Sequence, residues 1–506
     1  MADAKTFDVE AKTFDDSPRE KSIATDEDGN TVVVGVADNL VIDKHAERRL
    51  VRKFDVRILP LLAVMYLLNS LDKSNLGNAK TGGTFESDLG MAGTNEYNIV
   101  IAVFFIPYVL TAPFLGILGK KYGPSRVLPI MMACFGLMTV CMAAVQSFGG
   151  VFALRWFLGM AESAFFPLVI YYQTQFYKRG ELARRLALFY AASNIAGAFG
   201  GLLAFGVFQI KNAALQNWRY LFIIEGSLTI VMSVVAFMFL PYSAAEARFL
   251  NDEEKKLAFY RMQIDSSAVV NEKFVLREAL KIFKQPTSWM ILGIEMCLGV
   301  PLQSVQLFLP QIVARLGYST VKTNLYTVAP NIVGAVVLLI LAFSSDLTRL
   351  RFPFVALGFL LTFLGFIIYA AIDVQHSLQV AYFATFLMTM GTSAPSVILD
   401  VWASNNIASE NRRVVLTSVA VPVANMMGVL SSNIFFPSSA PNYIPALATT
   451  AAFGGTGILL TLLLGGWMVV DNRRRNLRQG LNRSGQDVPT ELLAEGPASE
   501  HFRWYL

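Results

Sequence analysis

Long apolar stretches alternate with short polar ones along most of the chain. A membrane-spanning helix needs about 20 mostly apolar residues, because it rises about 1.5 Å per residue through a hydrocarbon layer about 30 Å thick. Stretches of this length recur at short intervals, and each predicts one span. The predicted spans are 57–78, 97–119, 127–147, 149–175, 185–209, 219–241, 288–314, 324–345, 353–372, 378–402, 412–436 and 443–470. The pattern therefore predicts an all-α membrane protein with about twelve spanning helices.

A polar stretch in the middle of the chain separates the first six predicted spans from the last six. It covers 242–287 and contains a charged run at 251–256 and an amphipathic segment at 274–280, which predict a cytosolic linker with two helical pieces. Two sets of six spans around a longer loop are the layout of a duplicated transporter. We therefore expect six-helix halves at 56–241 and 288–471, a disordered cytosolic tail at 1–55 and a cytosolic tail at 472–506.

The composition agrees with a membrane protein and excludes several other classes. Hydrophobic residues make up 54% of the 506 positions and charged residues 16%, whereas soluble proteins carry about 25% charge. The net charge of +5 is small, and the basic residues form short clusters between apolar runs, which does not suit a nucleic-acid-binding protein. The three cysteines lie inside apolar runs and have neither disulfide nor zinc spacing. No metal, cofactor or nucleic acid is expected.

Lysine and arginine gather in alternate loops between the predicted spans. The basic loops contain, among others, Arg48, Lys53, Lys120, Arg126, Arg184, Arg349, Arg412 and Arg474. The loops between spans 3 and 4, 9 and 10, and 11 and 12 contain no Lys or Arg. Because basic loops remain on the cytosolic side of a membrane, both termini are expected in the cytosol.

Charged residues inside the first predicted span are candidates for function, because a charge in the membrane costs several kcal/mol by most estimates. Asp72 and Lys73 are adjacent, so on a helix they point about 100° apart. One interpretation is a pair that reaches the membrane interface. In the other, Lys73 offers positive charge to an anionic solute and Asp72 orients it or pairs with another helix.

Further charges occur in spans 4, 6, 7 and 10. Arg155 and Glu162 lie seven residues apart and so share one helix face. They form either a structural ion pair with another helix or a site in which Glu162 carries a coupling proton and Arg155 adjusts its charge or binds solute. Glu225 and Glu295 have no partner that the sequence identifies, and a structural role is favoured for both. Asp400 is expected at the cytosolic face, with a role in gating or at the helix end.

Uncharged polar residues inside spans are weaker candidates. Asn194, Asn331 and Asn425 should face the interior of the bundle, because an amide without a partner is unfavourable in lipid. They are expected either to line the cavity or to join helices. Five aromatic residues are candidates for the cavity wall: Phe105, Tyr108, Phe165, Tyr171 and Phe308.

Several blocks of the chain are distinctive when they occur together, among them LDKSNLGNA at 71–79, FFIPY at 104–108, YGPSR at 122–126, RWFLGMAE at 155–162 and GAFGG at 197–201. With these blocks the chain resembles the fungal allantoate permease family, in the anion:cation symporter branch of the major facilitator superfamily. The resemblance runs from about residue 53 to 475. It implies a twelve-helix fold of two halves that rock about a central site, and proton-coupled uptake of small organic anions or amides such as nicotinate, biotin, pantothenate or allantoate.

The resemblance also implies roles for individual residues. Arg155 falls on the superfamily's span 4 arginine motif, which is associated with proton coupling. The gating positions in the two halves correspond to Lys120, Arg126, Asp346 and Arg349. Lys120 replaces the acid that is usual in the superfamily's motif between spans 2 and 3, and Lys73 stands where many relatives have arginine. Lysine is a point charge and lacks the bidentate fork of arginine. Glu295 and the segment 393–395 are not expected of vitamin carriers, which points to a different solute in the second half.

The resulting prediction is a proton-driven transporter of a small, anionic organic solute, working as a monomer in a fungal plasma membrane. Solute would bind at Lys73, Arg155, Asn194 and Asn425, and protons at Glu162, Glu225 or Asp72. The alternative on the same fold is a proton-antiport exporter of a fungal secondary metabolite. A nutrient sensor is disfavoured by the short tails. An enzyme is excluded because the sequence has no nucleophile elbow, phosphate loop or metal-ligand spacing.

Overall fold

The computed structural model describes residues 23–25, 31–33, 43–210, 214–265, 276–407, 409–439, 442–485 and 496–506. Two units are distinguished, 1–44 and 45–506. In the first, strands β1 (Ile23–Thr25) and β2 (Thr31–Val33) pair antiparallel, with Ile23 opposite Val33. These strands fall in the range expected to be a disordered tail. The second unit holds all the membrane helices.

The described residues contain twelve helical segments that are long and apolar enough to cross a membrane, which confirms the predicted fold class. The first six comprise α1 (Lys44–Arg57), α2 (Leu59–Thr81), α4 (Glu96–Tyr122), α5 (Pro124–Met142), α6 (Phe148–Glu162), α7 (Phe165–Thr174), α8 (Arg179–Val207) and α9 (Asn217–Phe239). The last six comprise α12 (Pro286–Ala314), α13 (Thr320–Tyr326), α14 (Val328–Thr348), α15 (Phe352–Ala371), α16 (Leu378–Asn405), α17 (Glu410–Ile434) and α18 (Ile444–Gln479). Consecutive helices α1–α2, α6–α7 and α13–α14 each make one crossing.

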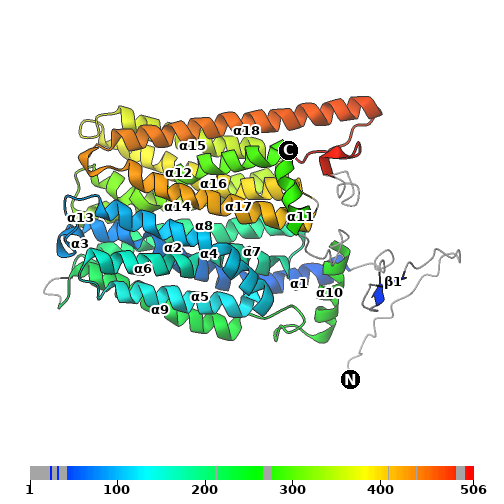
Figure 1. The fold of residues 1–506 in the computed structure, drawn as a ribbon, viewed down its shortest axis with the longest axis horizontal. Coiled ribbons are helices and arrows are strands. Elements are labelled where there is room, and N and C mark those ends of the chain that lie inside the picture. The colour runs from blue at the N-terminus through cyan, green and yellow to red at the C-terminus, as the bar shows by residue number, and fades with distance from the viewer. Residues whose placement is uncertain are drawn as a thin grey trace, which may run out of the picture. The chain divides into compact units, whose positions relative to one another are not determined.

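The helices form two halves in chain order. Within the first half α5 packs on α9, α2 on α8 and α4 on α6, and within the second half α15 packs on α16 and α18. The halves meet where α8 contacts α14, α4 contacts α17 and α2 contacts α12. In Figure 1 the helices from α2 to α9 lie together below those from α12 to α18. The interface between the halves therefore involves a few helices from each, and polar side chains there are shielded from lipid.

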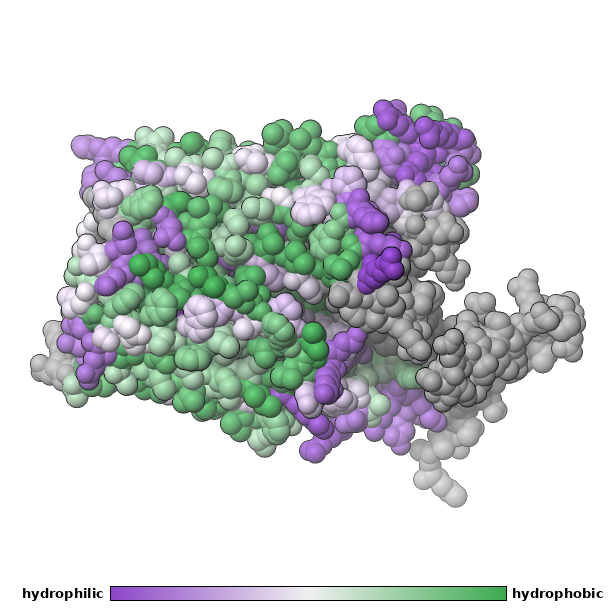
Figure 2. Space-filling view, viewed as in Figure 1, coloured by the Kyte–Doolittle hydropathy of each residue, from purple (hydrophilic) through white to green (hydrophobic). Residues whose placement is uncertain are grey.

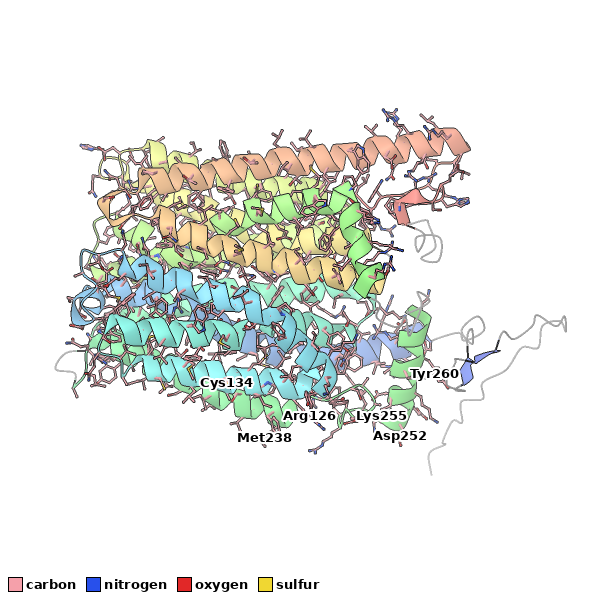
Figure 3. The ribbon with its side chains drawn as sticks, in the orientation of Figure 1. Arg126, Cys134, Met238, Asp252, Lys255 and Tyr260 are labelled. Carbon is pink, nitrogen blue, oxygen red and sulfur yellow. The ribbon has the colours of Figure 1, made fainter. Side chains whose placement is uncertain are left out.

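The outward surface of the bundle is apolar over its middle and polar at its ends, as Figure 2 shows. Large side chains such as Phe114, Val231, Phe237 and Leu459 are exposed there. Cys134 on α5 and Met238 on α9 lie on this surface in Figure 3. Exposed apolar area on this scale is not compatible with water and fits contact with lipid.

Short elements connect the spans. They are α3 (Phe85–Asp88), α10 (Asp252–Asp265), α11 (Leu276–Ala279) and the 3₁₀ turns η1 (Leu280–Lys284), η2 (Pro437–Ser439) and η3 (Gly496–Ala498). Helix α10, which carries Asp252, Lys255 and Tyr260 in Figure 3, lies in the predicted linker at one end of the bundle, and α3 lies at the other. We call these the α10 end and the α3 end.

Ion pairs fasten α10 to the first half. Lys53 on α1 contacts Glu254 at 2.6 Å, and Arg261 pairs with Glu47 and with Glu181 at the start of α8. Partial burial acts to raise the pKa of Glu254, but the hydrogen bonds from Lys53 and from the backbone of Asn251 outweigh it, so this pKa lies below its usual value. The linker is thus held by charge at the α10 end.

The C-terminal residues also pack at the α10 end, although 472–506 was expected to be a tail. Helix α18 continues to Gln479, and Trp504 is buried beside Trp467 with its Nε1 2.8 Å from the Asp471 carboxylate. The Tyr505 carbonyl accepts a hydrogen bond from Trp402 Nε1 on α16 at 2.9 Å. The segment 496–506 therefore ties α16 to α18.

Candidate functional site: a polar cavity between the halves

A polar cavity lies between the two halves and is lined by residues of both. Its volume is about 70 Å³, and we call it the central cavity. Its polar and aromatic lining consists of Tyr66, Asn69, Ser70, Lys73, Tyr108, Glu162, Phe166, Tyr190, Ser193, Glu295, Gln303, Gln306, Ser396, Asp400 and Asn425. Since a water needs about 10–15 Å³ by this measure, the cavity holds a few waters and must widen to admit an organic solute.

A second cavity of about 40 Å³ adjoins the first and shares Lys73 with it. Asn194, Asn331 and Ser393 line it, and we call it the side cavity. The Ser393 hydroxyl donates to Asn194 Oδ1 at 2.8 Å across the interface of the halves. Asn194 therefore lines a cavity and joins two helices at once, so the two alternatives considered for it are not exclusive.

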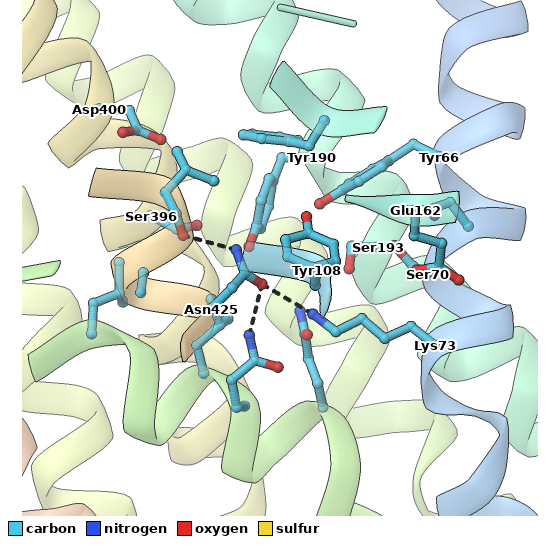
Figure 4. A pocket seen from close by; sticks show the side chains of 18 of the residues that line it. Tyr66, Ser70, Lys73, Tyr108, Glu162, Tyr190, Ser193, Ser396, Asp400 and Asn425 are labelled. Carbon is cyan, nitrogen blue, oxygen red and sulfur yellow. Dashed lines mark hydrogen bonds between the residues drawn. The ribbon is translucent and has the colours of Figure 1, made fainter. Parts of the chain in front are cut away.

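Lys73 on α2 is the cation of the central cavity. Its Nζ donates to Asn425 Oδ1 on α17 at 3.2 Å, and the same oxygen accepts from Gln303 Nε2 at 3.2 Å (Figure 4). The ammonium also lies 5.2 Å from the ring centre of Phe105. Within the described residues no carboxylate pairs with Lys73. A neutral amide is a weak partner for a cation, so Lys73 can take a stronger one.

Glu162 at the end of α6 lines the same cavity and is almost fully buried. Its Oε1 has no hydrogen-bond partner. A buried carboxyl group with an open oxygen at a cavity is a place where gain or loss of one proton changes the local charge by a full unit. Glu162 and Lys73 thus present opposite charges to one space, and the state of one alters what the other can bind.

Three predicted site residues lie behind the cavity wall. The Arg155 guanidinium rests 5.2 Å from the Phe104 ring centre, and its Nε and Nη1 have no partner. Asp72 accepts a hydrogen bond from Thr229 at 2.9 Å, while Glu225 is fully buried with both oxygens unpartnered. None of the three lines either cavity. Arg155 therefore lies outside the lining of both cavities in this conformation.

The wall from the second half is acidic. Glu295 on α12 is 3% exposed, lines the central cavity and has no partner for Oε1. Asp400 on α16 lines it as well, which differs from the gate or helix-end role expected for it. The reason is that Asp400 lies one turn beyond Ser396 in the continuous helix α16, so both point to the same face.

Aromatic side chains of the central cavity were only partly predicted. Of the five considered, Tyr108 lines the central cavity, and Phe308 instead stacks on Phe435 with ring centres 4.1 Å apart. Tyr66, Phe166 and Tyr190 line the cavity but were not selected. Tyr66 could have been found, because it lies seven residues before Lys73 and so on the same face of α2.

The predicted gating residues lie at the α10 end, and an ion-pair network there joins the halves. Asp346 contacts Arg351 at 2.5 Å within the second half and Arg184 of the first half at 3.4 Å. Arg349 ends α14 in a left-handed conformation with φ 59°. The other two are exposed: Lys120, and Arg126 with its guanidinium 5.3 Å from the Tyr242 ring centre.

The halves also touch at the α3 end of the cavity. Gln311 Nε2 donates to the Tyr97 hydroxyl at 3.2 Å, and Asn98 Nδ2 donates to the Phe435 carbonyl at 2.8 Å. At Gly77 an added Cβ would lie 2.7 Å from the Leu307 carbonyl oxygen. The close approach of backbone on both sides requires glycine here. The two halves are therefore in direct contact at the α3 end of the cavity, and at the α10 end an ion pair between side chains joins them.

Comparison with known proteins agrees with this arrangement. The Major Facilitator Superfamily profile matches residues 62–432. An uncharacterised transporter of Schizosaccharomyces pombe is 53% identical over 92% of each chain, and the major facilitator-type transporter hxnP of Emericella nidulans is 39% identical over 92% of this chain and 95% of its own. The high-affinity nicotinic acid transporter of Saccharomyces cerevisiae is 28% identical over 88% of this chain and 82% of its own.

Solved structures show the same fold. The proton:xylose symporter XylE, bound to 6-bromo-6-deoxy-D-glucose, superposes with a TM-score of 0.64 at 15% identity, covering 82% of this chain and 95% of that one. The curated relatives above are named as transporters, which confirms that the chain is a membrane transporter and not an enzyme. This multi-pass membrane protein therefore belongs to the major facilitator superfamily.

Proposed function

We propose that this chain is a proton-coupled importer of a small organic anion, in the anion:cation symporter branch of the superfamily. The observation that carries the proposal is Lys73, which lines both cavities between the halves and has an amide, not a carboxylate, as its side-chain partner. A cation in this position attracts an anionic solute. The name of the yeast relative, a nicotinic acid transporter, supports a carboxylate as cargo.

Proton coupling is assigned to Glu162. It shares the central cavity with Lys73, so an ionised Glu162 competes with solute for the positive charge. When Glu162 binds a proton, Lys73 is left for the carboxylate of the solute. Arg155 is buried behind the cavity wall and does not contact the solute. Its positive charge attracts both the Glu162 carboxylate and the solute carboxylate. Anion and proton are then favoured to bind as a pair.

Alternating access follows from the two contact regions. Opening toward the α10 end breaks the pair between Arg184 and Asp346, and opening toward the α3 end breaks the contact between Tyr97 and Gln311. We propose that the α10 end and both termini lie in the cytosol, because basic loops remain on the cytosolic side of a membrane. We further propose that the protein works as a monomer in a fungal plasma membrane.

The test is uptake in a fungal strain that lacks its vitamin and carboxylate carriers. Cells expressing the protein are given labelled nicotinate, pantothenate, biotin or allantoate, with and without a proton uncoupler. We expect uncoupler-sensitive uptake of one compound, lost in Lys73→Ala and retained in Lys322→Ala, which removes an exposed lysine of α13 outside both cavities. No uptake of any compound, with the protein confirmed at the cell surface, would contradict import and favour export.

A further inference from the structure

The acidic side of the central cavity is not explained by transport of a simple anion. Glu295 and Asp400 come from different helices, α12 and α16, and both line the space that Lys73 enters. Gln303, also from α12, is 1% exposed and leaves its Oε1 without a partner in the same wall. A solute carrying only a carboxylate would be repelled by this side of the cavity. It would also leave the acceptor oxygens of the cavity wall without a hydrogen-bond donor.

No cation of the protein balances these two carboxylates. Neither Glu295 nor Asp400 forms an ion pair with any residue that the structure describes, and the Lys73 ammonium is directed to Asn425. Unbalanced charge is expensive inside a membrane protein, so such residues are expected to meet a partner during function. A cation that enters the cavity would be such a partner.

Aromatic rings line the same space. Tyr66, Tyr108 and Tyr190 belong to the first half, and the rings of Tyr66 and Tyr190 lie 5.8 Å apart. Figure 4 shows Asp400 and Lys73 entering from opposite sides of the cavity, with Tyr108 between them. Aromatic faces attract organic cations, above all those with quaternary nitrogen. A cationic group placed near Glu295 and Asp400 would therefore meet both carboxylates and rings.

We propose that the cargo is a zwitterion, a small solute with a carboxylate at one end and a nitrogen cation at the other. Its carboxylate binds Lys73 as in the proposed function, on which this inference rests. Its cation binds between Glu295 and Asp400 of the second half. The first half then recognises the anion common to many solutes, and the second half selects those that also carry a positive charge.

The test uses four probes of nearly equal size: benzoate, nicotinate, N-methylnicotinate and N-methylpyridinium. They carry, in order, a carboxylate alone, a carboxylate with a neutral ring nitrogen, a carboxylate with a fixed cation, and the cation alone. Binding to the purified full-length protein in lipid nanodiscs is measured for each. We expect N-methylnicotinate to bind about tenfold more tightly than benzoate, since one added charge contact contributes on the order of 1.4 kcal/mol.

Glu295→Gln should remove that preference by weakening the binding of N-methylnicotinate, while benzoate, which is then repelled less, binds at least as tightly as before and so reports intact folding. Asp400→Asn is a second, independent variant with the same expected result. Glu253→Gln, an exposed carboxylate on α10, is the matched control and should keep the preference.

The outcomes separate this inference from the proposed function. Equal binding of benzoate and N-methylnicotinate in the wild type and in both variants, with both probes weakened by Lys73→Gln, would overturn the zwitterion and leave anion transport standing. Tightest binding of N-methylpyridinium, insensitive to Lys73→Gln, would contradict the proposed function itself.

Discussion

The two halves use charge at the cavity in different ways. In the first half Asp72, Arg155 and Glu225 are buried behind the wall, and Lys73 and Glu162 reach the central cavity. In the second half the carboxylates Glu295 and Asp400 both line the cavity itself, beside amides and hydroxyls. Charged side chains behind the cavity wall interact with one another, whereas charged side chains that line the cavity interact with a solute that enters it. If the proposed function holds, this difference assigns proton coupling to the first half and selection of the cationic end of the solute to the second.

The largest expected effect is the loss of coupling in Glu162→Gln. If Glu162 carries the proton, the variant cannot link the solute to the proton gradient and should lose uphill accumulation. Exchange of solute across the membrane should persist, because Lys73 is unchanged. Accumulation and solute exchange are measured in parallel in proteoliposomes.

Glu225→Gln sharpens the same comparison. Glu225 lines neither cavity, so this variant should retain gradient-driven accumulation within a few-fold of the wild type. The reverse result, in which Glu225→Gln loses coupling and Glu162→Gln keeps it, would move the proton site from the cavity to the buried cluster.

A smaller effect is expected where the halves touch. In Gly77→Ala the added methyl group meets the Leu307 carbonyl oxygen at 2.7 Å, and a backbone atom cannot move aside as a side chain does. Overpacking costs about 1–3 kcal/mol, so closure at the α3 end should weaken about tenfold and uptake should fall. Labelling of a cysteine introduced near Tyr97 would report the opening. Gly206→Ala, which meets nothing within 4 Å, should behave as the wild type.

The smallest effect on transport is expected from the C-terminal segment of the second half. Trp504→Ala removes a buried ring and its bond to Asp471, and Trp504 lines neither cavity. Thermal unfolding in detergent should begin a few degrees lower, since loss of a buried Trp costs about 3–5 kcal/mol. Solute affinity should not change. Leu477→Ala, at an exposed position of α18, should change neither the unfolding temperature nor the solute affinity. A change in solute preference in Trp504→Ala would contradict the view that the C-terminal segment acts on stability and not on the cavity.

Much of the fold was predictable from the sequence because lipid imposes a length and a polarity on each span. The ends of the chain were less predictable. Helix α18 runs nine residues past the predicted limit of 470. Charged residues such as Arg473 and Arg478 end the hydropathy signal there although the helix continues into water. The docking of Trp504 depends on contacts with distant helices, which no local pattern encodes.

The site was predictable in part. A charged residue inside an apolar span can be recognised from the sequence alone, so Lys73 and Glu162 were predicted as site residues. Both line the central cavity in the structure. The same signal does not distinguish the cavity wall from the layer behind it, which is why Arg155 and Glu225 were grouped with them. Asp400 was assigned to the membrane face because the depth of the cavity along α16 depends on the neighbouring helices.

The central claim is that Lys73 binds an anionic solute whose entry is driven by protons. The most direct measurement is accumulation of the labelled panel compound by purified protein in proteoliposomes, with an imposed gradient that is acidic outside. We predict accumulation above the external concentration, collapse of that accumulation by an uncoupler, and no accumulation by Lys73→Ala. Accumulation by Lys73→Ala equal to that of the wild type, or accumulation that does not depend on the imposed proton gradient, would contradict the account.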